Sequence, residues 1–223
     1  MFKKVFALVL IFITVGFFLS CDTSSDDTDD KPKVNNNSSN NTNNSNDNNN
    51  VNNNDNDNYE PSAKIIVISD IHVFDPDLYT ADNLEFQMYL VKDRKLIEES
   101  EAILDSVVDS IIAQNPDIVL IPGDLTKDGE LASHELVASY LDELENAGIK
   151  VYVVPGNHDI NNPESYSYTN GSKELSDTVS PTEFKSIYNN FGYGEAVATD
   201  SNSLSYVVEP IPGLVIIGMD SCI

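Results

Sequence analysis

The chain has few cysteines, few basic residues and few histidines, and these shortages limit what the protein can be. Two cysteines, Cys21 and Cys222, cannot build the framework of several disulfides that staples small secreted domains. Only 12 lysines and arginines accompany 37 aspartates and glutamates, giving a formal net charge of −25. Because nucleic-acid binding needs a positive surface, we expect no nucleic-acid partner.

The first 21 residues are predicted to be an export signal that ends in a lipid-attachment site. A short basic start, Met1–Lys4, precedes an apolar run at 5–19 that is too short to span a membrane comfortably. Phe18-Leu19-Ser20-Cys21 resembles a bacterial lipobox, in which the cysteine carries the lipid. A plain signal peptide or a marginal membrane anchor is the alternative. The lipobox predicts an exported protein, lipid-anchored at the surface of a cell-envelope membrane, and leaves Cys222 without a disulfide partner.

Residues 22–60 are rich in asparagine and contain nine acidic groups but almost no apolar residue. A segment that buries so little cannot offset the entropy lost on ordering, so we expect a disordered linker. Residues 61–223 form the part that can fold, and their 28 acidic against 8 basic residues give a net charge of −20. An acidic surface repels phosphates, so phosphate chemistry here would need bound cations.

The globular part alternates apolar, β-branched runs with helical patterns. Strand, helix, strand, helix, strand predicts an α/β fold with mostly parallel strands and crossover helices. Residues 79–92 fit neither pattern and are interpreted as an insertion that could wall a substrate pocket. The strands are predicted at 64–69, 117–121, 150–154, 204–208 and 214–217, and the helices at 94–114 and 131–147.

Three short motifs of potential metal ligands each follow one of these strands. They are Asp70-Ile71-His72, Gly123-Asp124 and Gly156-Asn157-His158-Asp159. The carboxyl ends of parallel strands meet at one edge of the sheet, where ligands bind. Glycine beside the ligands lets the backbone turn sharply and approach a metal or phosphate closely. The pattern therefore predicts a metal site at this edge.

Together the three motifs resemble the calcineurin-like metallophosphoesterase superfamily, from about Lys64 onward. The resemblance implies an α/β/β/α sandwich, of which this chain would carry the N-terminal portion. It also implies a hydrolase with two divalent metal ions, for which mixed nitrogen and oxygen ligands suit Mn, Fe, Zn or Co. The implied metal ligands are Asp70 and His72 for the first ion, Asp124 as the bridge, and Asn157 for the second.

The resemblance also implies how phosphate mono- or diesters would be cleaved. A hydroxide shared by the two ions would attack phosphorus. His158 would be the general acid for the leaving oxygen, and Asp159 would orient the His158 ring. Similarity around the motifs is greatest to the cyclic-nucleotide phosphodiesterase-like branch, which would make cyclic nucleotides candidate substrates.

The chain departs from the family pattern because no histidine follows His158. The family's second metal also takes histidines from later strands, so this chain as printed is expected to be a fragment with little or no turnover. The run 214–217, interpreted as a buried parallel strand, supports that expectation. The alternative is a catalytically degenerate surface lipoprotein that serves as a binding module.

Two other polar residues receive structural interpretations. His134, early in the second predicted helix, is interpreted as a solvent-exposed histidine. Asp128 could support the metal ligands from behind them or be a first-turn acid that favours the start of that helix, and the second interpretation is preferred.

Overall fold

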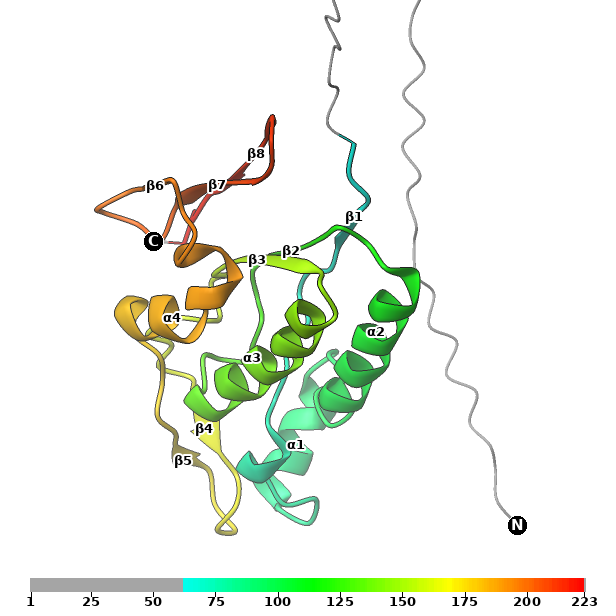
Figure 1. Ribbon diagram of the computed structural model, residues 1–223. Helices are drawn as coiled ribbons and strands as arrows, with labels where there is room; N and C mark the ends of the chain where they lie inside the picture. The colour runs from blue at the N-terminus through cyan, green and yellow to red at the C-terminus, as the bar shows by residue number, and fades with distance from the viewer. Residues whose placement is uncertain (1–61, 223) are drawn as a thin grey trace, which may run out of the picture. The chain divides into compact units, whose positions relative to one another are not determined.

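The computed structural model describes residues 62–222 (Figure 1). The predicted export signal, the lipid-attachment site at Cys21 and the whole of the predicted linker lie outside the described residues. Within them, no helix is both long enough and apolar enough to cross a membrane.

The first sheet contains three parallel strands in the order β1, β2, β3, joined by crossover helices (Figure 1). Residue Val119 lies opposite Ile66 on one side and Val151 on the other. This arrangement confirms the predicted α/β fold class. The elements are β1 (Ile65–Val67), α2 (Ser100–Gln114), β2 (Ile118–Pro122), α3 (Leu131–Asn146) and β3 (Lys150–Val154).

The core lies between this sheet and the apolar faces of α2 and α3, which pack side by side (Figure 1). Strands β2 and β3 are almost wholly buried, as their continuous apolar runs predict. Strand β1 differs, since Ile65 is 41% and Val67 58% exposed. A continuous apolar run is typical of a strand buried on both faces, and β1 departs from that pattern.

A second sheet is antiparallel and corrects the prediction for residues 214–217. Strand β8 (Leu214–Gly218) pairs antiparallel with β7 (Tyr206–Ile211), which in turn pairs with β6 (Ala198–Thr199). Only Pro212 and Gly213 separate β7 from β8, and a parallel pair would need a crossover of a dozen residues or more. The run is also not buried, since alternate side chains of β8 are exposed.

Three helices or hairpins were not predicted. Helix α1 (Leu84–Lys92) occupies the unassigned region and is capped by Asn83, whose side-chain oxygen accepts two backbone N–H bonds. Helix α4 (Pro181–Ile187) begins with a capping box between Ser180 and Glu183, a readable start signal. Strands β4 (Tyr166–Ser167) and β5 (Glu174–Leu175) form a small hairpin. Aromatic rings of Phe74, Tyr79, Phe86, Tyr89 and Tyr168 join α1 to this hairpin.

Candidate metal centre

The predicted ligands lie where strands of the first sheet end, on backbone held in an unusual conformation. Asp70, His72 and Asp124 have φ values of 56°, 44° and 49°. This left-handed region is costly for residues other than glycine and is often found at functional sites. The two loops run side by side, because the His72 N–H donates to the Asp124 carbonyl at 3.0 Å.

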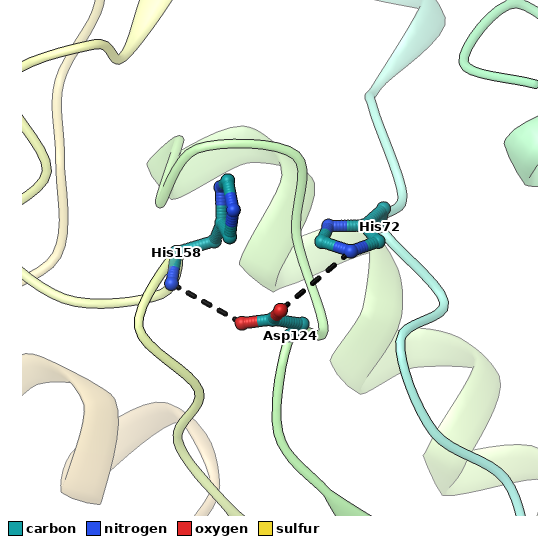
Figure 2. Close-up of side chains that lie close together, drawn as sticks. All are labelled: His72, Asp124 and His158. Atoms are coloured by element: carbon teal, nitrogen blue, oxygen red, sulfur yellow. Dashed lines mark hydrogen bonds and ion pairs between the residues drawn. The ribbon is translucent and has the colours of Figure 1, made fainter. Parts of the chain in front are cut away.

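His72, Asp124 and His158 converge into one cluster (Figure 2). The carboxylate of Asp124 lies between the histidines: Oδ2 is 3.6 Å from His72 Nε2, and Oδ1 accepts the His158 backbone N–H at 3.2 Å. The two imidazole rings meet edge to face with centroids 5.0 Å apart. The three residues offer ligand atoms that all lie within 4.8 Å of one another. Such a group can hold a divalent cation.

The His72 ring is arranged to present Nε2 as a ligand. Its Nδ1 lies 3.3 Å from the Thr126 carbonyl oxygen, which would accept a proton from Nδ1, and 3.2 Å from the Lys95 ammonium, which would need a lone pair there. Only the tautomer with the proton on Nδ1 leaves Nε2 free to bind a metal ion. Burial, followed by the charge of Lys95, lowers the pKa of His72 below its ordinary value. A neutral ring at neutral pH is the form that binds metal.

Gly156 has no side chain because the backbone beside Asp124 leaves no room for one. A Cβ at Gly156 would lie 2.1 Å from both the backbone nitrogen and Oδ1 of Asp124. A Cβ at Gly123 would in turn lie 2.8 Å from the Gly156 Cα. The glycines in the two motifs therefore allow the loops after β2 and β3 to touch.

Asp159 does not orient the His158 ring, so that prediction is wrong. Its buried carboxylate accepts hydrogen bonds from the backbone N–H groups of Leu125, Thr126 and Gly156, and from the Thr126 hydroxyl. Four donors from two loops leave Asp159 as a structural clamp between the loop after β2 and the loop after β3. Burial raises the pKa of Asp159, and these hydrogen bonds oppose the rise.

The carboxylate that contacts the His158 ring belongs to Asp128. Its Oδ1 lies 2.9 Å from His158 Nδ1. The interpretation of Asp128 as a first-turn acid is wrong, because α3 begins three residues later, at Leu131. A signal was present in the sequence, since an acid four residues after Asp124 stays in the same loop and can reach the same rim.

Asp70 and Asn157 are exposed, and Asp70 is not part of the cluster. The Asp70 carboxylate accepts a hydrogen bond from the Ser69 hydroxyl and lines a cavity of 420 Å³ beside His72 and Lys95. Asn157 lines a different cavity, of 760 Å³. The first-metal ligand set predicted from the sequence is therefore brought together only in part.

His134 is fully buried, which corrects the prediction of a solvent-exposed histidine. Its Nε2 lies 2.8 Å from the Asp159 carbonyl oxygen, and its Nδ1 lies 2.8 Å from the Tyr188 hydroxyl. A neutral ring satisfies both contacts, with Nε2 donating and Nδ1 accepting. His134 thus fixes the loop that carries His158 to α3. Burial lowers the pKa of His134 to about 4.

We expect the burial of His134 to make the fold sensitive to acid. Its pKa is about 4 when folded and about 6.5 when unfolded, so between these values the unfolded chain binds more protons. The contribution of neutral His134 to the free energy of unfolding is complete above pH 6.5 and is lost as the pH falls toward 4. It amounts to about 3 kcal/mol. Urea unfolding at several pH values will show this. In His134→Gln the profile should be flatter, and an unchanged profile would contradict the assignment.

The geometry agrees with a match to known proteins. The family model for calcineurin-like phosphoesterases matches residues 63–211. The chain belongs to the calcineurin-like phosphoesterase family. A relative named as a probable cyclic nucleotide phosphodiesterase, from Ruthia magnifica subsp. Calyptogena magnifica, is 31% identical over 101 residues. That match covers 45% of this chain and 35% of the relative.

Calcineurin-like phosphoesterases depend on metal, and the cluster fits one divalent cation. His72 supplies a nitrogen donor and Asp124 an oxygen donor, and a nitrogen of the His158 imidazole lies within 4.8 Å of both. Mixed donors of this kind suit Mn, Fe, Zn or Co.

Proposed function

We propose that this protein hydrolyses phosphate esters in a reaction that depends on divalent cations. The observation that carries the proposal is the meeting of His72, Asp124 and His158 within 4.8 Å at the strand ends. The domain is acidic as a whole, so a cation held there would supply the local positive charge that a phosphate needs.

Different residues of the chain would bind the cation and transfer the proton. His72 Nε2 and the Asp124 carboxylate would hold the cation, which when bound neutralises phosphate charge and lowers the pKa of water. The contact with Asp128 engages Nδ1 of His158 and leaves Nε2 free. In the imidazolium form that nitrogen would also carry a proton, which it could donate to the leaving oxygen as the ester bond breaks, while Nδ1–H stays on Asp128. The His158 side chain is 28% exposed, so it can reach a bound ester.

We propose a phosphodiester, and specifically a cyclic nucleotide, as the substrate class. The name of the Ruthia relative supports the substrate, and the cavities of 420 Å³ and 760 Å³ beside the predicted ligands offer space for it. A second ion is proposed with Asp124 and Asn157 among its ligands, and Asp70 would join the first. Export and lipid attachment at Cys21 are proposed from the sequence alone.

Hydrolysis of two aryl phosphates by the full-length protein tests the function. We expect bis(4-nitrophenyl) phosphate to be cleaved faster than 4-nitrophenyl phosphate, with all activity lost on chelation and restored by Mn²⁺. A 3′,5′-cyclic nucleotide tests the narrower substrate class. Turnover that survives chelation would contradict the proposal. Tight Mn²⁺ binding without any turnover would favour the degenerate binding module.

A further inference from the structure

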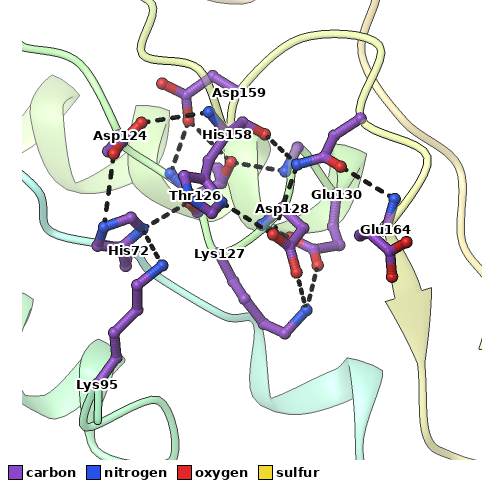
Figure 3. Close-up of polar contacts among 12 residues, drawn as sticks. His72, Lys95, Asp124, Thr126, Lys127, Asp128, Glu130, His158, Asp159 and Glu164 are labelled. Carbon is purple, nitrogen blue, oxygen red and sulfur yellow. Dashed lines mark hydrogen bonds and ion pairs between the residues drawn. The ribbon is translucent and has the colours of Figure 1, made fainter. Parts of the chain in front are cut away.

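A buried lysine lies behind His158, and the proposed reaction gives it no role. Lys127 is only 1% exposed, although lysine is rarely buried without partners. Its Nζ lies 2.5 Å from Asp128 Oδ2 and 3.3 Å from Glu130 Oε1 (Figure 3). Burial opposes the charge of Lys127, but the carboxylates of Glu130 and Asp128 outweigh it and raise the lysine pKa. The ammonium is therefore charged inside the fold.

Aromatic rings fix the position of this ammonium. Nζ lies 5.1 Å from the Phe74 ring centroid and 4.8 Å from that of Tyr89, within the range of cation–π attraction. Phe74 follows β1, and Tyr89 lies on α1. Both belong to the aromatic cluster that joins α1 to the β4–β5 hairpin. Segments outside the metal motifs thus hold Lys127 in place.

Asp128 divides its two carboxylate oxygens between Lys127 and His158. Oδ2 meets the ammonium, while Oδ1 meets Nδ1 of the imidazole at 2.9 Å. The Asp128 backbone N–H donates to Glu130 Oε2 at 3.0 Å, so Glu130 binds both Lys127 and the loop. The ammonium at Oδ2, together with Asn162 Nδ2 at 3.4 Å from Oδ1, restrains the carboxylate from rotating away from the ring.

We propose that Lys127 is a positioning residue for His158, acting through Asp128. The ammonium sets the plane of the Asp128 carboxylate, and that carboxylate sets the tautomer and angle of the imidazole. This inference rests on the proposed function, because it gives Lys127 a purpose in phosphate-ester hydrolysis. It also gives the aromatic cluster of α1 and the β4–β5 hairpin a purpose, which is to hold the lysine.

The imidazole N–H signal of His158 in the metal-free, full-length protein tests the placement directly. Lys127→Met is combined with Glu130→Gln so that the fully buried Glu130 is not left charged without its cation, and Asp128 keeps its charge beside His158. In this double variant we expect the Nδ1 proton to exchange with water at least about tenfold faster, in line with the cost of losing an outer-shell partner. Lys127→Arg, which keeps the charge, should preserve the signal. An unchanged signal in the folded double variant would overturn the proposal.

Tyr89→Leu provides a second variant if the double variant does not fold. This change removes the ring that contacts the Lys127 ammonium and keeps every charge. The Nδ1 proton of His158 should therefore exchange faster than in the parent protein, but by a smaller factor than in the double variant. No change in Tyr89→Leu would likewise overturn the proposal. Because the signal is read without metal or substrate, it decides the role of Lys127 even in a protein that hydrolyses nothing.

Kinetics provide the second reading. The double variant should lose about tenfold in kcat on phenyl phosphate, keep its KM, and lose little on 4-nitrophenyl phosphate, whose leaving group needs no proton. In a His158→Ala background the Lys127 change should cost nothing further. An equal loss in that background would show that Lys127 acts elsewhere and would overturn the proposal.

Discussion

Replacing Asp124 with asparagine is expected to lower kcat/KM for phosphate esters by at least about a thousandfold, on the scale of losing a central electrostatic contact in a catalytic site. Asp124 is the anionic member of the cluster, and both histidines contact it. Asparagine keeps the size and can still accept the His158 N–H, but it carries no charge to hold a cation. We therefore expect a folded protein that has lost Mn²⁺ affinity by more than about a hundredfold.

Calorimetric Mn²⁺ titration, together with ester hydrolysis, measures both losses. Asp109→Asn is the matched control, since it removes the same charge from an exposed position on α2. That control should bind Mn²⁺ and turn over as the parent does. Parental metal affinity in Asp124→Asn would show that the cation site lies elsewhere.

Much of the architecture that places Asp124 could be predicted from the sequence. The apolar runs of β2 and β3, with a helical pattern between them, are enough to predict parallel pairing, because parallel strands need a crossover. Parallel pairing then predicts that Asp124 and His158 meet at one edge, and the structure brings them together. Spacing along the chain cannot show which carboxylate faces which ring.

The exchange of roles between Asp128 and Asp159 illustrates that limit. Both are aspartates near His158, and the adjacent one was predicted to orient the ring. In the structure, Asp159 meets four donors from two loops, while Asp128 lies in the loop before α3 and faces the imidazole. Which carboxylate turns inward depends on contacts between loops, and these contacts leave no periodic pattern in the sequence.

The environment of Lys127 was equally hard to predict, for a different reason. The ring of Tyr168 lies 5.4 Å from that of Phe86, although the two residues are far apart in the sequence. Helix α1 exposes Leu84 and Met88, so apolar side chains lie on more than one side of it and blur the helical pattern. Only the fold brings this aromatic cluster to the lysine.

Asp159→Asn should reduce the free energy of unfolding by about 2–5 kcal/mol, because it leaves buried donors unpaired at about 1–3 kcal/mol each. The Asp159 side chain is fully buried, and each of its two carboxylate oxygens accepts two hydrogen bonds. In asparagine, the NH₂ group must face two of those donors. Typical domains have about 5–15 kcal/mol of stability in total, so the variant should unfold at a much lower urea concentration.

The hydrogen bonds of Asp159 also predict that the loss in free energy of unfolding increases with the number of hydrogen bonds removed. Thr126→Val deletes one hydroxyl donor to the carboxylate and the acceptor of the Gly129 N–H, so it should cost about 1–3 kcal/mol. Asp105→Asn, on the exposed face of α2, should cost less than about 0.5 kcal/mol. Urea unfolding of all three variants at pH 7 gives the comparison. If Asp159→Asn were no less stable than Thr126→Val, the two loops would be held together by something other than this carboxylate, such as the pairing of β2 with β3 and the contact of His134 with the Asp159 carbonyl oxygen.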